Sequence, residues 1–128
     1  MTSSRSLHLG EFAARVLVVP IFVTSGIGKL TAWNSNVAYM ATRQLPAIRL
    51  LLATAALIEL IGSVCVISGV RLRTAAIVLG VYLVIVTCTF HDFWNVSGMN
   101  ASMQRTQFLE NVAIVGGLLH IAFTRRAS

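Results

Sequence analysis

The chain has 128 residues, of which 56% are hydrophobic and 11% charged, and its mean hydropathy is +0.80. These values lie outside the range of ordinary soluble domains and predict a protein that is surrounded by lipid. The formal net charge of +6 comes from basic residues that flank apolar runs, a pattern typical of membrane interfaces that argues against a nucleic-acid partner.

Four apolar segments follow one another, and each has close to the roughly 20 residues with which a helix crosses a bilayer. Strands of this length would leave unpaired backbone groups facing lipid, so helices are predicted. The expected fold is all-α: an integral membrane four-helix bundle with a short interfacial helix in the first outer loop, forming a single transmembrane domain over residues 1–128. The predicted spans are 12–30, 47–70, 73–93 and 108–124.

The first segment could imitate a secretory signal peptide, because Arg5 precedes an apolar run. The run continues through Pro20 and Gly26 to Lys29, which favours a retained first helix. Helical spacing places Arg15 and Lys29 on one stripe that is expected to face the bundle interior. Pro20 is expected to bend this helix.

The connections differ in character. In the first, 31–46, Trp33 to Asn36 precede residues 37–45, which predicts an N-capped short helix at the interface. Residues 71–73 form a tight basic turn. The third connection, 95–107, is polar and is predicted to be irregular.

Glu59 is the clearest polar residue inside an apolar run, since it lies halfway along the second segment. Gly62 and Gly69 share its helical face, and small residues there would let a neighbouring helix approach closely. We therefore expect Glu59 to face inward and to pair with Arg15. The pair could lock the helix register or take part in function, and both readings stay open.

The third and fourth segments bring further polar residues to one end of the bundle. His91 and Trp94 end the third segment and Asn111 opens the fourth, at a depth similar to that of Lys29. Together they could bind a quinone head group or a small anion, or they could anchor the helix ends in the headgroup layer. Asp92 is expected to be a solvated neighbour of His91. Structural roles are expected for Pro20, Gly26, Gly62, Gly69, Arg73 and Gly117.

No metal or redox motif stands out. The histidines lack ligand spacing and no phosphate-binding loop is present. Cys65 and Cys88 lie at depths about 15 Å apart on the helix reading, so they are expected to be small core residues without a disulfide. The bias of basic residues predicts cytoplasmic termini, on the side that carries Arg5, Arg15, Arg71, Arg73, Arg125 and Arg126.

Four blocks carry a family resemblance: RVLVVPIFVTSGIGKL at 15–30, ELIGSVCVISGVRLR at 59–73, FHDFWN at 90–95 and QFLENVAIVGGLL at 107–119. In this order and spacing the chain resembles the DoxX family of small four-helix bacterial membrane proteins. The family's usual Lys-Asn in the last block is Glu110-Asn111 here. The matching candidate positions are Arg15, Gly26, Lys29, Glu59, Gly62, Arg73, His91, Trp94 and Asn111.

The resemblance implies a place in the bacterial inner membrane and an association with redox systems. The first hypothesis is a quinone-linked membrane subunit that binds no covalent cofactor, so that a protein partner with a redox cofactor supplies the electrons. Glu59 or His91 would then handle protons. One alternative is an anchor or assembly factor without activity of its own. Another is a small proton or metabolite carrier, for which four short helices leave little room unless the protein oligomerises. No catalytic residue is assigned.

Overall fold

The computed structural model describes residues 4–124, and over this range it contains helices and turns but no strand. Four of its helices are long and apolar enough to cross a membrane, which confirms the predicted all-α membrane fold. The elements are α1 (Ser4–Thr31), α2 (Trp33–Ala41), α3 (Ile48–Ser68), α4 (Leu72–Phe90), η1 (Phe93–Asn95) and α5 (Met99–Phe123).

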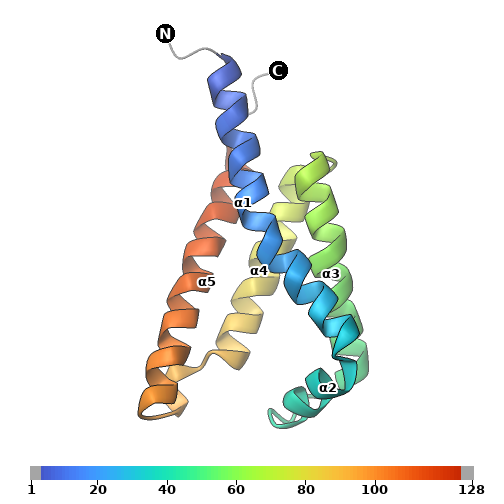
Figure 1. Ribbon diagram of the computed structural model, residues 1–128, viewed down its shortest axis with the longest axis vertical. Helices are drawn as coiled ribbons and strands as arrows, with labels where there is room; N and C mark the ends of the chain where they lie inside the picture. The colour runs from blue at the N-terminus through green and yellow to red at the C-terminus, as the bar shows by residue number, and fades with distance from the viewer. Residues whose placement is uncertain (1–3, 125–128) are drawn as a thin grey trace.

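The long helices form two pairs, α1 with α3 and α4 with α5, and α3 also packs on α4. The pairs separate toward the end of the bundle that carries α2 and η1, here called the α2 end (Figure 1). At the opposite end lie the α3–α4 turn, the start of α1 and the end of α5. We call this the turn end.

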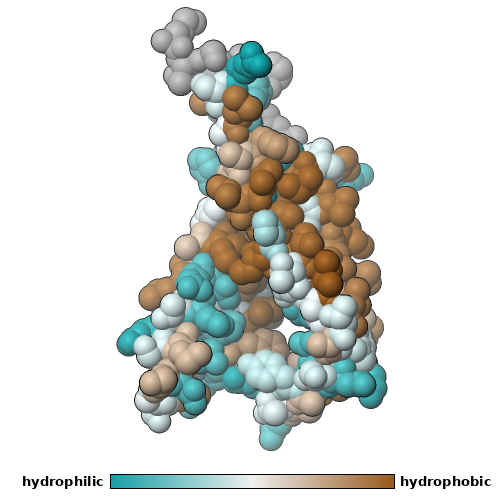
Figure 2. Space-filling view, viewed as in Figure 1, coloured by the Kyte–Doolittle hydropathy of each residue, from teal (hydrophilic) through white to brown (hydrophobic). Residues whose placement is uncertain are grey.

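The apolar core lies between the helices toward the turn end. Leu79, Leu118 and Val66 are fully buried, and Phe22 lies against them. Many other large apolar side chains are exposed and cover the middle of the bundle (Figure 2). In lipid, such exposed side chains cost nothing, so the helices are held together by close packing and internal hydrogen bonds.

Glycines permit the closest helix contacts. A Cβ at Gly26 would lie 2.7 Å from Leu60 Cγ on α3, and one at Gly62 would lie 2.9 Å from Leu79 on α4. The expectation that Gly62 faces a neighbouring helix is confirmed. Gly69 ends α3 with a φ of 82°, a conformation that glycine adopts without steric cost. Gly117 makes an ordinary contact with Val18.

Two predicted boundaries are wrong. Residues 95–107 are helical from Met99 onward, because α5 begins with a polar stretch that a search for apolar runs overlooks. The short helix starts at Trp33 and has no side-chain cap. Instead, Asn36 Nδ2 donates to the carbonyl oxygens of Gly28 and Ala32 at 3.4 and 2.8 Å, so it satisfies the end of α1.

Other expectations are met only in part. α1 continues as one helix through Pro20, and the bend expected there stays a prediction. Cys65 and Cys88 are free thiols, and Cys88 is exposed at the bundle surface, not in the core as expected. Arg125 and Arg126, which contributed to the predicted orientation, lie outside the described residues.

Candidate functional site

Glu59 lies at the centre of a polar cluster between α1, α3 and α4. Its residue is only 3% exposed, and its carboxylate accepts hydrogen bonds from three side chains. Lys29 Nζ lies 3.0 and 3.2 Å from the two oxygens, Ser25 Oγ lies 3.1 Å from Oε1, and Tyr82 Oη lies 2.5 Å from Oε1. Lys29 also donates to Ser25 at 2.6 Å. The charge of the buried carboxylate is therefore neutralised and solvated inside the chain.

The predicted pair of Glu59 with Arg15 is wrong. Arg15 lies nearer the turn end, where its Nη2 donates to the carbonyl oxygen of Ile67 at 2.8 Å. Arg15 and Lys29 occupy the same inward stripe of α1, and the position of α1 along α3 brings Lys29 to the depth of Glu59. The cation that pairs with Glu59 is therefore Lys29, at the opposite end of that stripe from Arg15.

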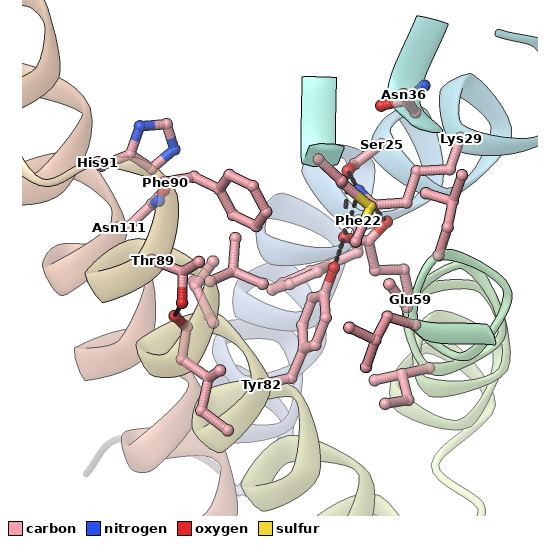
Figure 3. A pocket seen from close by; sticks show the side chains of 18 of the residues that line it. Phe22, Ser25, Lys29, Asn36, Glu59, Tyr82, Thr89, Phe90, His91 and Asn111 are labelled. Atoms are coloured by element: carbon pink, nitrogen blue, oxygen red, sulfur yellow. Dashed lines mark hydrogen bonds and ion pairs between the residues drawn. The ribbon is translucent and has the colours of Figure 1, made fainter. Parts of the chain in front are cut away.

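A cavity of about 620 Å³ lies beside the cluster and is bordered by α1 to α5. Phe22, Leu52 and Leu83 contribute apolar walls. Figure 3 shows Tyr82 reaching toward Ser25, Lys29 and Glu59, while His91 and Asn111 lie on the other side of the view. The cavity is therefore largely apolar, with polar groups at separate parts of its wall.

The second polar part of the wall comes from α4 and α5. His91 Nδ1 lies 2.8 Å from Gln104 Oε1. Asn111 is buried and its Nδ2 donates to Thr87 Oγ1 at 3.1 Å. This part of the wall offers an imidazole beside an amide.

The α2 end of the cavity is spanned by contacts between the turn after α2 and the end of α4. Arg43 Nη1 lies 2.8 Å from Asp92 Oδ1, and Tyr39 stacks on Phe90 with ring centroids 5.5 Å apart. Asn95 Nδ2 donates to the other Asp92 oxygen at 2.9 Å. The hydrogen bond that Arg43 donates to the Asp92 carboxylate raises the pKa of Arg43. Asp92 is thus ion-paired, in contrast to the solvated neighbour that was expected.

Of the residues expected to converge, Lys29, His91 and Asn111 line the cavity and Trp94 does not. Trp94 is 55% exposed and makes edge contacts with Phe93 and Phe108. It lies in η1, after the chain has left α4 at Phe90. The anchoring role considered for it agrees better with this position.

Sequence reasoning missed Ser25, Tyr82 and Arg43. Tyr82 had a usable signal, since a phenol inside an apolar span needs a hydrogen-bond partner. Arg73, expected to be structural, donates from Nε to the Ala122 carbonyl oxygen at 2.8 Å near the end of α5. Within residues 4–124 no group of three His, Cys, Asp or Glu side chains could hold a metal ion.

Comparison with known proteins gives one family and a small set of relatives. The DoxX family model matches residues 10–92. Inner membrane protein YqjF of Escherichia coli is 30% identical over 91% of this chain and 84% of its own length. Inner membrane protein YphA of the same organism is 28% identical over 87% of this chain and 79% of its own length. No solved structure matches the chain.

Proposed function

The chain belongs to the DoxX family, and on that premise we propose that it is an inner-membrane protein that binds a quinone-like ligand in its interhelical cavity. In this proposal it serves as the membrane subunit or partner of a redox system. Its relatives YqjF and YphA are inner membrane proteins by name and align over most of their length, which supports the location.

One observation carries the ligand proposal: a buried, hydrogen-bonded carboxylate faces an apolar cavity inside a membrane protein. Ionisable groups at this depth are costly and are typical of ligand or proton sites. The volume of about 620 Å³ suits a ring with part of an apolar tail. Lys29 on one side and the second N–H of the Asn111 amide on the other suit a ring that carries two carbonyl groups.

Protons would move through side chains, and electrons would come from elsewhere. Reduction of a quinone to a quinol consumes two electrons and two protons. Tyr82 Oη is hydrogen-bonded to Glu59, so in this proposal the phenol gives one hydrogen to the reduced ring and regains it through Glu59, while the second proton and the one that reloads Glu59 come from solvent. A partner protein with a redox cofactor would supply the electrons.

Equilibrium binding of decylubiquinone to the purified protein in lipid nanodiscs tests the proposal. We expect saturable binding that Glu59→Gln and Tyr82→Phe weaken, because both variants change the polar wall of the cavity. Glu11→Gln is the matched control, since it makes the same chemical change outside this cavity. Absence of saturable binding, or an equal effect of Glu11→Gln and Glu59→Gln, would refute the proposal.

A second candidate function is an anchor or assembly factor for a partner enzyme. It is favoured by the fact that the Glu59 carboxylate already has several donors within the chain. A cluster satisfied in this way can stabilise the helix register without binding anything. This alternative predicts that Glu59→Gln leaves the activity of the co-purifying partner unchanged, whereas the ligand proposal predicts a loss.

A further inference from the structure

A second cavity, of about 400 Å³, lies at the turn end, far along α1 from Lys29 and Glu59. The first turns of α1, the start of α4 and the end of α5 border it. Its lining includes two opposite charges on α1, Glu11 and Arg15, together with apolar side chains of Leu7, Leu72 and Ile121. The function proposed above uses none of these residues.

Arg15 carries a positive charge that the described residues do not balance. No carboxylate among them lies within 4.0 Å of its guanidinium, and Nη2 reaches only the Ile67 carbonyl oxygen. Nε is buried without a hydrogen-bond partner. The end of α3 offers a partial negative charge, which is less than an ionic partner would provide. An anion at this cavity would complete the neutralisation.

Glu11 lies one helical turn before Arg15, a spacing at which Glu and Arg commonly pair. Here Arg15 instead donates to a carbonyl oxygen of α3, and among the described residues the basic side chain beside Glu11 is His8, whose Nδ1 lies 4.0 Å from Glu11 Oε2. A cation and an anion therefore face one cavity about 6 Å apart along α1. A ligand with both charges would match this arrangement better than an anion alone.

The cavity lies where two of the apolar spans end, which is the depth at which lipid head groups are expected. Arg15 contacts the last turn of α3, and Leu72 begins α4, so the cavity lies level with the turn between two spans. α1 continues for residues 4–14 beyond this level, about 16 Å at 1.5 Å per residue. Leu72 and Ile121 would contact the glycerol and the first acyl carbons.

We propose that this cavity binds a phospholipid that carries both a phosphate and a primary amine, as a phosphatidylethanolamine does. The phosphate would accept hydrogen bonds from Arg15, and the ammonium would donate to Glu11. A choline head group has no N–H donor for Glu11, and a glycerol head group has no cation. The carboxylate thus provides selectivity and the guanidinium provides affinity.

Native mass spectrometry of the full-length protein, released from equimolar phosphatidylethanolamine, phosphatidylcholine and phosphatidylglycerol, tests the proposal. We expect preferential retention of phosphatidylethanolamine. Glu11→Gln should remove the preference over phosphatidylcholine, by about tenfold for one charge-assisted hydrogen bond. Arg15→Gln should lower retention of every phospholipid, whereas Arg15→Lys should keep part of it. Glu110→Gln and Arg105→Gln, at the other end of α5, are the matched controls. They should change neither the preference for phosphatidylethanolamine nor the retention of phospholipids.

The following results would overturn the proposal or assign a different ligand to the cavity. Equal retention of phosphatidylethanolamine and phosphatidylcholine by the native protein, or an effect of Glu11→Gln no larger than that of Glu110→Gln, would overturn the proposal. Stronger retention of phosphatidylglycerol would assign a simple anionic-lipid site instead. Competition by water-soluble glycerophosphoethanolamine at lipid-like concentrations would overturn the assignment to a lipid. Helical circular dichroism and monodisperse elution establish that each variant is folded.

Discussion

At the scale of single residues, the main finding is how a carboxylate is accommodated within the bundle. Glu59 is nearly inaccessible, and an ionised carboxylate in lipid costs several kcal/mol unless it is paired. Lys29 provides the counter-ion, while Ser25 and Tyr82 fill further acceptor positions. The stability of the pair should thus depend on both partners together.

The Lys29–Glu59 pair should show strong coupling in a double-mutant cycle. Lys29→Gln leaves Glu59 buried without a counter-ion, which should cost about 3–5 kcal/mol, and the double variant with Glu59→Gln should recover part of that loss. Thermal unfolding in mild detergent measures the change in the free energy of unfolding for each variant. The cycle of Arg15→Gln with Glu59→Gln is the control and should be additive, since these residues do not touch. An additive Lys29 cycle would contradict the pairing.

At the scale of elements, glycines set the distance between helices, and long side chains hold α2 in place. Gly26 lets α1 approach α3, and Gly62 lets α3 approach α4. α2 has no comparable packing against α4, and the link between their ends is made by Arg43 with Asp92 and by Tyr39 with Phe90. The helix pairs should thus be rigid and α2 easier to displace.

Gly26→Ala should destabilise the bundle, because the added methyl group would lie 2.7 Å from Leu60 Cγ. Such overpacking typically costs about 1–3 kcal/mol. The matched control is Gly28→Ala on the same helix, where nothing lies within 4 Å of the added Cβ. The midpoint of thermal unfolding should fall for the first variant and stay level or rise for the second. Equal midpoints would show that α1 and α3 are not in close contact at Gly26.

Arg43→Gln should loosen α2 without unfolding the long helices, since it breaks the ion pair with Asp92. Hydrogen exchange of the backbone amides of residues 33–41 should become faster, and that of α4 should change little. Arg49→Gln serves as the control, because Arg49 is exposed and forms no ion pair among the described residues. Restored protection in the charge-swapped pair Arg43→Asp with Asp92→Arg would support the contact. Unchanged exchange in Arg43→Gln would argue against it.

At the scale of the whole molecule, four apolar helices make this a multi-pass membrane protein. The two cavities lie at opposite ends of the bundle, with the Glu59 cluster bordering the larger one. We propose that the turn end is cytoplasmic, because six basic residues of the sequence belong to this side and four to the other. The six are Arg5, Arg15, Arg71, Arg73 and, directly after α5 in the sequence, Arg125 and Arg126, and the four are Lys29, Arg43, Arg49 and Arg105. The larger cavity would then open toward the outer side.

Cysteine labelling tests this orientation. In a background that lacks Cys65 and Cys88, a cysteine at the exposed position Ser102 should react with a membrane-impermeant maleimide in intact cells. Ser6→Cys, at the opposite end of the bundle, should react only after lysis. The reverse pattern would invert the proposed topology, and both cavities would exchange sides.

Much of this architecture follows from the sequence by itself. Hydropathy along the chain predicts the four spans, because each crossing must satisfy its own backbone and present apolar side chains to lipid. Helical spacing predicts that Glu59 and the stripe from Arg15 to Lys29 face inward, and Val19 and Phe22 on that stripe are indeed buried. These are local properties, set by the period of one helix.

Only the tertiary structure decides which inward groups meet. Arg15 and Lys29 share one face of α1, so periodicity cannot choose between them as partners of Glu59. The choice depends on how far α1 is displaced along α3, where Gly26 fits against Leu60. The separation of the helix pairs that opens the larger cavity, and the pairing of Arg43 with Asp92, likewise depend on contacts between residues distant in the chain. Such contacts arise from the packing of several helices at once, which no single segment specifies.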